Sequence, residues 1–146
     1  SLHDALPIYE HFDVQNYIKS ADEFPLKVGS IQINNYNYVT NASDKNTTSL
    51  VMSFHLANRD FLITGDAPKE IEKEIMSNYS SIKCDVLKVG HHGSNTSTSE
   101  EFIQYLSPKE AVISCGKNNS YGHPHQEVID ILNKIRGGMK ACLMIN

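Results

Sequence analysis

The chain has 146 residues, a length that suits a single domain with its own hydrophobic core. Its residues are 40% hydrophobic and 21% charged, as in ordinary globular proteins, and no apolar run approaches the ~20 residues that a membrane-spanning helix needs. The net charge of -4 argues against a passive nucleic-acid-binding surface, although bound divalent metals would reverse the local charge.

The first half of the chain predicts short antiparallel strands. Four segments have the apolar residues and the flanking turn residues of strands: residues 26–28, 31–33, 49–54 and 61–64. The first two segments and the last two are each expected to form a hairpin, because only a short connection separates them. Residues 36–39 predict a further short strand, and the polar residues 41–48 predict a loop.

The second half of the chain alternates predicted strands and helices. Three apolar segments predict strands: residues 84–89, 111–114 and 139–145. One helix is expected with Pro68 in its first turn, and another after a capping box at Ser97–Glu100. Apolar residues at helical spacing predict the last helix: Val128, Ile131, Leu132 and Ile135. This order favours a layered α/β domain over a β-sandwich or a helical bundle.

Polar side chains follow three of the predicted strands. Asp66, the pair His91-His92, and His123 each come directly after a strand or a short turn that ends it. Strand ends in layered α/β folds lie along one edge of the sheet, where sites are commonly built. Taken singly, Asp66 could be a helix N-cap and the histidines could be loop or capping residues. Taken together, a carboxylate and imidazoles form a ligand set for zinc, with manganese or iron as alternatives.

Three sequence blocks carry a resemblance to a known family. They read SLVMSFHLANRDFLITGDA at residues 49–67, CDVLKVGHHGS at residues 84–94 and NSYGHPH at residues 119–125. These blocks resemble the metallo-β-lactamase domain of ComEC-type competence proteins and their soluble relatives. The resemblance covers residues 26–136, and it implies an αββα metallo-β-lactamase sandwich of which this chain holds the C-terminal part.

The opening residues resemble the translation of a short-read sequencing adapter, and the family resemblance implies the rest of the domain organisation and a role for individual residues. We expect residues 1–8 to be a sequencing-adapter artefact, residues 9–25 to be a linker and residues 26–146 to be an incomplete metallo-β-lactamase domain. The resemblance implies metal ligands, shared between two divalent ions such as zinc or manganese: Asp66 as the bridging aspartate, His91 and His123. It implies catalytic roles for Asp66 and His92, with His92 also an alternative ligand to His91. Four further residues are expected to bind or orient a phosphate: Ser94, Asn119, Tyr121 and His125.

The function that the resemblance implies is metal-dependent hydrolysis by water activated at a binuclear centre. We expect the parent protein to be a nuclease or phosphodiesterase linked to DNA uptake, acting on DNA or a phosphodiester. Its membrane-channel domain would lie in the same full-length chain and tether it to the bacterial cell membrane; otherwise it would be cytoplasmic or secreted. The alternatives are a soluble metallo-hydrolase of a small ester, lactone or phosphodiester, and a catalytically inert fragment.

One departure from the family pattern bears on activity. The family's HxHxDH motif, which supplies most of the remaining metal ligands, is absent from this sequence, and residues 1–25 contain only His3 and His11 as histidines. We therefore expect this chain to be inactive by itself, even if the full-length parent is an enzyme.

Overall fold

The structure is a computed structural model that describes residues 24–134 and 140–145. The expected artefact at residues 1–8 and nearly all of the expected linker at residues 9–25 lie outside the described residues. None of the helices in the described part of the chain has the length and apolar character that crossing a bilayer requires.

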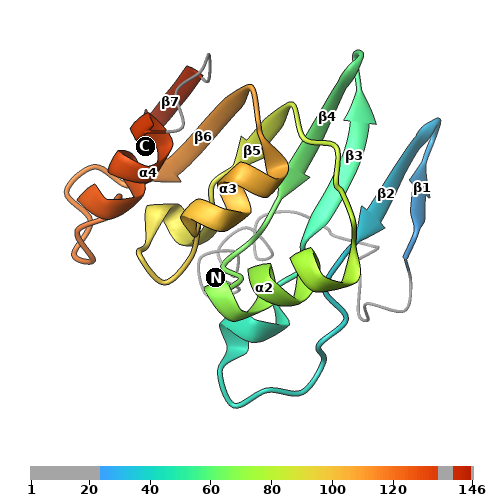
Figure 1. Cartoon of the computed structure of the whole chain (residues 1–146), viewed down its shortest axis with the longest axis horizontal. Coiled ribbons are helices and arrows are strands. Elements are labelled where there is room, and N and C mark those ends of the chain that lie inside the picture. Colours follow the sequence, from blue (N-terminus) through green and yellow to red (C-terminus); the bar gives the residue numbers. More distant parts are fainter. Residues whose placement is uncertain (1–23, 135–139, 146) are drawn as a thin grey trace, which may run out of the picture.

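A seven-stranded sheet forms the centre of the molecule, with its strands in the order in which they follow one another along the chain (Figure 1). Its strands are β1 (Leu26–Val28), β2 (Ile31–Asn35), β3 (Met52–Leu56), β4 (Arg59–Ile63), β5 (Val86–Lys88), β6 (Glu110–Cys115) and β7 (Lys140–Ile145). The first four strands pair antiparallel, whereas β4 to β7 pair parallel. The two expected hairpins are therefore confirmed.

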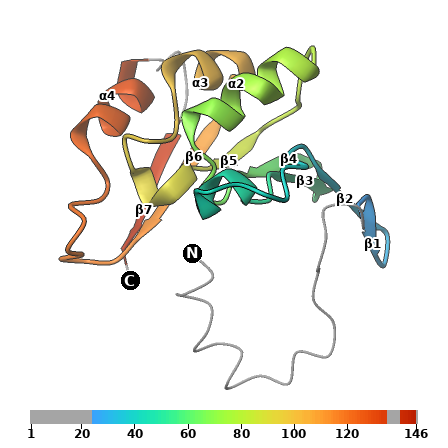
Figure 2. The same cartoon turned by 90° about the horizontal axis from the view of Figure 1, so that it is seen from below.

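Three helices, α2 (Lys69–Asn78), α3 (Glu100–Leu106) and α4 (Gln126–Lys134), connect the parallel strands. Parallel neighbours need a crossover connection, and each helix provides one between consecutive strands. Figure 2 shows all three helices on the same side of the sheet. The expected α/β class is confirmed, and one sheet with helices on one face is the layer pair expected for part of an αββα sandwich.

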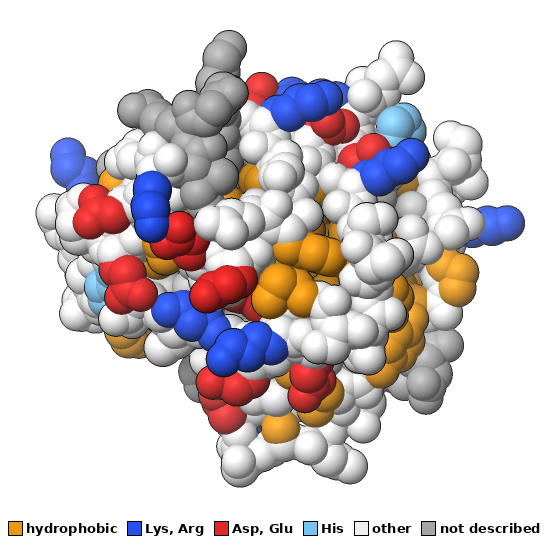
Figure 3. Space-filling model, viewed as in Figure 1, with side chains coloured by type: hydrophobic (Ala, Val, Ile, Leu, Met, Phe, Trp, Pro, Cys, Tyr) orange, Lys and Arg blue, Asp and Glu red, His pale blue; other side chains and the backbone are white. Residues whose placement is uncertain are grey.

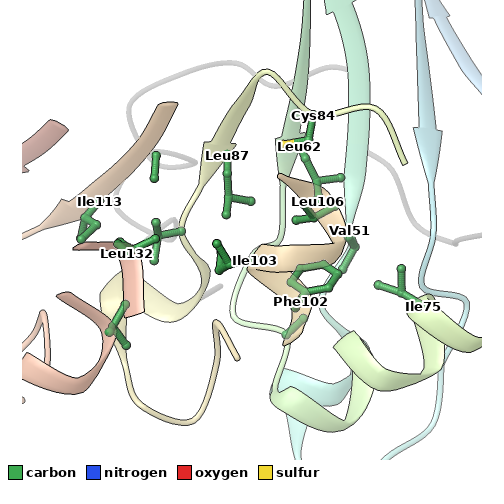
Figure 4. Close-up of a cluster of buried hydrophobic side chains, with 14 of the residues drawn as sticks. Val51, Leu62, Ile75, Cys84, Leu87, Phe102, Ile103, Leu106, Ile113 and Leu132 are labelled. Atoms are coloured by element: carbon green, nitrogen blue, oxygen red, sulfur yellow. The ribbon is translucent and has the colours of Figure 1, made fainter. Parts of the chain in front are cut away.

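The hydrophobic core lies between the sheet and these helices (Figure 4). Leu62, Leu87 and Ala111 stand in register across β4, β5 and β6, and each is at most 1% exposed. Phe102 and Ile103 of α3 pack against them from the helix layer. Truncating a buried residue of this size to alanine typically costs about 2–5 kcal/mol of stability. Because side chains alternate along a strand, the next residues of β4 to β6 point to the opposite face.

Residues 36–39 do not form the expected strand. Asn35 and Asn37 replace ladder hydrogen bonds with side-chain amide bonds: Asn35 Oδ1 accepts the N–H of Val51 at 3.1 Å, and Asn37 Nδ2 donates to the carbonyls of Thr47 and Ser49 at 2.8 Å each. The polar stretch at residues 41–48 is a loop as expected, and it ends in the 3-10 helix η2 (Lys45–Thr48).

Two expected helix starts are shifted. The residue that caps α3 is Ser99, whose Oγ accepts the N–H of Phe102 at 3.3 Å, whereas Ser97 donates its hydroxyl to the carbonyl of Ala67. The N-cap position of α2 is Pro68, so the interpretation of Asp66 as the N-cap is wrong. The capping alternative thus does not account for an aspartate at this point of the chain.

Candidate metal centre

The side chains that the sequence singled out follow the carboxyl ends of three neighbouring parallel strands, β4, β5 and β6. Asp66 comes after β4, the histidine pair after β5, and His123 after β6. These ends lie on one edge of the sheet because the three strands run in the same direction.

Asp66 lies in a tight turn between β4 and α2 and is 8% exposed. The turn depends on Gly65, which has a left-handed φ of 55° and approaches Ser49 so closely that a Cβ would lie 3.2 Å from the Ser49 Cβ. The backbone N–H of Asp66 donates to Ser49 Oγ at 3.2 Å. The chain before β3 therefore fixes the position of this carboxylate.

The histidine pair forms a strained turn, the 3-10 element η3 (Gly90–Gly93). His91 and His92 both have left-handed backbone angles, with φ of 46° and 55°. Such a conformation costs on the order of 1–3 kcal/mol for a residue with a side chain, so the surroundings must enforce it. One restraint is the N–H of His91, which donates to the carbonyl of Gly65 at 2.9 Å. The strained turn is thereby attached directly to the turn that carries Asp66.

His92 has one ring nitrogen bound to the protein and the other directed toward Asp66. Its Nδ1 lies 2.7 Å from the carbonyl of Ser114, and since a carbonyl only accepts, Nδ1 must carry the proton. In the neutral ring Nε2 is then a lone-pair donor, and it lies 3.9 Å from Asp66 Oδ1. Metal-binding histidines commonly donate their second N–H to a carbonyl in this way.

His91 makes a different set of contacts. Its Nδ1 lies 3.1 Å from Thr96 Oγ1, and its ring meets that of His123 edge to face with centroids 5.6 Å apart. His91 is thus beside His123, while His92 is beside Asp66. Which neighbour each histidine contacts is not predictable from spacing alone, because adjacent residues in a left-handed turn project in different directions.

His123 belongs to the loop between β6 and α4, and Asn119 holds this loop in place. The Asn119 amide donates to the carbonyl of His123 at 2.6 Å and accepts its N–H at 2.9 Å. Burial lowers the pKa of His123 below its usual value, the three neighbouring histidines lower it further, and Asp66 partly opposes them. A lowered pKa favours the neutral imidazole, the form that binds metal ions.

The two histidine loops are joined to each other. The N–H of His125 donates to the carbonyl of Gly93 at 2.9 Å, and His125 Nδ1 accepts the N–H of Asn95 at 2.9 Å. Gly93 has a φ of 83°, and a Cβ added to it would lie only 2.6 Å from the Cβ of Pro124. The close approach of the loops therefore requires glycine at this position.

The four residues expected to bind a phosphate differ in their accessibility. Tyr121 is 76% exposed and stacks on His123 with ring centroids 5.7 Å apart, and the partly exposed ring of His125 lies 4.9 Å from the same imidazole. Ser94 is buried and shares a hydrogen bond with Thr96, and Asn119 uses its amide within its own loop. Tyr121 and His125 are thus the members of the set that border the exposed rim.

The donor set suits a divalent metal such as zinc or manganese, since it consists of imidazole nitrogens and a carboxylate. The 3.9 Å between His92 Nε2 and Asp66 Oδ1 is close to the roughly 3–4 Å that separates two ligands with bonds of ~2.0–2.2 Å to one ion. Within residues 24–134 and 140–145, no three His, Cys, Asp or Glu side chains are arranged to hold an ion. The described residues therefore bring two pairs of donor side chains together, Asp66 with His92 and His91 with His123, and do not form a closed site.

Sequence comparison decides the family. The model of the metallo-beta-lactamase superfamily matches residues 42–117, about half of the chain, and this range includes Asp66 and both members of the histidine pair. The chain belongs to the metallo-beta-lactamase superfamily. This match confirms the family that the three sequence blocks indicated.

Among curated proteins, this metallo-beta-lactamase chain resembles competence proteins. It is 53% identical to ComE operon protein 3 of Bacillus subtilis over 92 residues, 63% of the chain. It is 37% identical to Recombination protein 2 of Haemophilus influenzae over 105 residues, 72% of the chain, and 38% identical to Competence protein ComA of Neisseria gonorrhoeae over 86 residues, 58% of the chain. The matched segments span 12%, 13% and 12% of those proteins, so the chain covers only a small part of each relative. The resemblance to ComEC-type proteins is confirmed.

Proposed function

We propose that this chain supplies part of the metal centre of a hydrolase, and that the full-length protein containing it is a nuclease or phosphodiesterase acting in DNA uptake. The observation that carries the proposal is the orientation of His92, whose Nδ1–H is bound by the Ser114 carbonyl while Nε2 lies 3.9 Å from Asp66. The name of one relative, Competence protein ComA of Neisseria gonorrhoeae, supports the link to DNA uptake.

In this proposal Asp66 and His92 hold one divalent ion, and His91 and His123 contribute to a second. The bound ions would polarise a phosphoryl oxygen and lower the pKa of a water molecule. The protein's own part is to favour the neutral form of His123 by lowering its pKa, to orient the imidazoles, and to place Tyr121 and His125 at the rim. Tyr121 and His125 would contact the phosphate of the substrate through their hydroxyl and ring N–H groups.

The distribution of surface charge limits where a nucleic acid would bind. On the side that carries the helices, Lys and Arg side chains are intermingled with Asp and Glu, and they form no uniformly basic stripe (Figure 3). Since this face offers no basic surface, we place phosphodiester binding at the sheet edge, where divalent ions would supply positive charge. This predicts that substrate binding depends on metal rather than on basic side chains.

The test is hydrolysis by the full-length protein with added manganese or zinc. We expect it to cleave bis(p-nitrophenyl) phosphate and single-stranded DNA, to lose this activity with a chelator, and to lose it by at least about 100-fold in Asp66→Asn, because the carboxylate ligand of one ion is removed. The 146-residue chain alone should give no turnover. Absence of chelator-sensitive turnover in the full-length protein would refute the proposal, and cleavage of esters or lactones without phosphodiesters would favour the small-molecule alternative.

A further inference from the structure

A buried carboxylate lies outside the candidate metal centre. Glu72, in the first turn of α2, is 2% exposed. Its carboxylate accepts the N–H of Thr98, the N–H of Ser99 at 2.9 Å and the hydroxyl of Ser99 at 2.6 Å. Removing a carboxylate from water is costly unless it is paired or hydrogen-bonded, so these three donors explain how Glu72 is tolerated there.

Glu72 binds Thr98 and Ser99, which are the last residues of the loop that follows the histidine pair. Thr98 has a left-handed φ of 64°, and its N–H is directed to the carboxylate. The same loop carries Thr96, whose hydroxyl lies 3.1 Å from His91 Nδ1. Glu72 therefore holds Thr98 and Ser99 at the end of this loop, and Thr96 of the same loop orients the His91 imidazole of the candidate metal centre.

This loop is also attached to the turn that carries Asp66. The N–H of Lys69 donates to the carbonyl of Thr96 at 3.0 Å, and Ser97 Oγ donates to the carbonyl of Ala67 at 2.7 Å. With the bonds of Glu72, the start of α2 is tied to the loop at three successive points. The carboxylate turn and the histidine loop are consequently joined by several hydrogen bonds.

We propose that Glu72 is a positioning residue of the metal centre, which locks the loop at residues 94–99 so that His91 and Asp66 keep the relative arrangement that binds metal. This inference rests on the proposed function. It goes beyond that function because it assigns a role in metal affinity to a side chain on α2 that contacts neither substrate nor ion.

A substitution that keeps the size of the side chain separates this role from packing. Glu72→Gln retains one oxygen acceptor and replaces the other with an NH₂ group, so at least one of the three donors loses its partner. The control is Tyr105→Phe, which also removes one hydrogen bond between α3 and α2, the bond from the Tyr105 hydroxyl to the carbonyl of Tyr79 at 2.8 Å. That bond lies at the other end of α2, away from the histidine loop.

The experiment measures manganese affinity by calorimetry, and thermal unfolding, in the full-length protein and both variants. Glu72→Gln should weaken manganese binding by roughly 10–100-fold, as substitutions of residues that orient ligands typically do, while Tyr105→Phe should change only the unfolding temperature. If Glu72→Gln does not fold, Glu72→Asp, which keeps the charge but shortens the side chain, takes its place with the same expected result.

The outcomes separate the two proposals. If the unmodified protein binds manganese and the Glu72 variant binds it equally well, Glu72 has only a structural role and the inference is wrong. Equal losses of affinity in the Glu72 and Tyr105 variants would also overturn it, because they would trace the loss to general destabilisation. If the unmodified protein binds no manganese or zinc, the proposed function itself fails, and the role of Glu72 with it.

Discussion

Two histidine–aspartate pairs in the described part of the chain lie in very different settings. His55 Nδ1 and Asp60 Oδ1 are 2.8 Å apart on neighbouring strands β3 and β4, and the histidine side chain is 61% exposed. His92 Nε2 and Asp66 Oδ1 are 3.9 Å apart, and the aspartate side chain is 11% exposed. The first pair is closed by a direct hydrogen bond on the surface, whereas the second has a wider separation that a shared metal ion would suit.

The backbone conformations near the two pairs can be compared in the same way. Ala57 and Asn58, beside the first pair, have left-handed φ angles of 49° and 61°, much like those of His91 and His92. At Ala57-Asn58 the conformation joins two antiparallel strands, and a two-residue hairpin turn favours it because it matches the strand twist. The histidine pair lies between a strand and a crossover helix, where no such local reason exists. Its strain is sustained by tertiary hydrogen bonds, which supports our proposal that this turn, rather than the hairpin turn, belongs to the functional site.

The largest expected effect comes from substituting one histidine of each pair. His92→Asn should lower metal-dependent phosphodiester turnover of the full-length protein by at least about 100-fold. The substitution removes both the proposed metal ligand, Nε2, and the Nδ1–H whose bond to the Ser114 carbonyl orients the ring. His55→Asn is the matched control and should leave turnover unchanged. The measurement is the turnover rate at saturating manganese. Equal rates in the two variants would remove the distinction between the pairs.

A smaller effect is expected from the glycines at left-handed positions. Gly93→Ala should destabilise the protein by about 1–3 kcal/mol from overpacking alone and displace the His125 loop, because the new Cβ would lie 2.6 Å from Pro124 Cβ. Gly29→Ala has a similar left-handed φ of 61° but meets no atom within 4 Å, so it should cost only the backbone term, about 1–2 kcal/mol, and no activity. Urea unfolding and turnover of both variants check this. A Gly93 variant with normal turnover would show that the loops need not touch.

Most of the fold was predictable from the sequence, because hairpin turns and helical spacing are local signals. The strand expected at residues 36–39 was not formed, since the Asn35 and Asn37 amides satisfy the backbone in a way that apolar patterning does not encode. The sequence pattern predicts a capping box that starts at Ser97, but the cap is Ser99. The pattern misses it because Glu72, from another helix, binds both Thr98 and Ser99.

The candidate site was predictable only in part. The residue types and their places after strands were visible in the sequence, but the partner of each histidine was not. The contact that orients His92 is a backbone carbonyl, that of Ser114, and a backbone group leaves no trace in residue identity. Thr96 and Glu72 were missed because a threonine in a polar loop and a glutamate on a helix are ordinary in isolation.

The smallest expected effect is on the pH dependence of stability. It should differ between Glu72, near the histidine loop, and Asp85, near the β3–β4 hairpin. Burial raises the pKa of Glu72, near the histidine loop, above its usual value of 4.5, although the bonds from Ser99 and Thr98 oppose this. A raised pKa means that the native state holds the proton more readily than the unfolded state. The resulting stability is present below pH 4.5 and is lost as the pH rises through the folded pKa. Glu72→Gln should therefore lack this decline.

Asp85, which lies beside the β3–β4 hairpin, is expected to give stability the opposite dependence on pH. The bond to Lys109, followed by that from the N–H of Asp60, lowers the pKa of Asp85 below its usual value of 3.8. Its stability is present above pH 3.8 and is lost as the pH falls through the folded pKa, so Asp85→Asn should reduce the acid sensitivity of the protein. Denaturant unfolding from pH 3 to 7 of the protein and both variants measures the two slopes. Opposite shifts in pKa produce opposite slopes of stability against pH. If Glu72→Gln and Asp85→Asn changed the pH dependence of stability in the same direction, the pKa values of Glu72 and Asp85 would not be shifted in opposite directions, and this contrast between the two regions would be wrong.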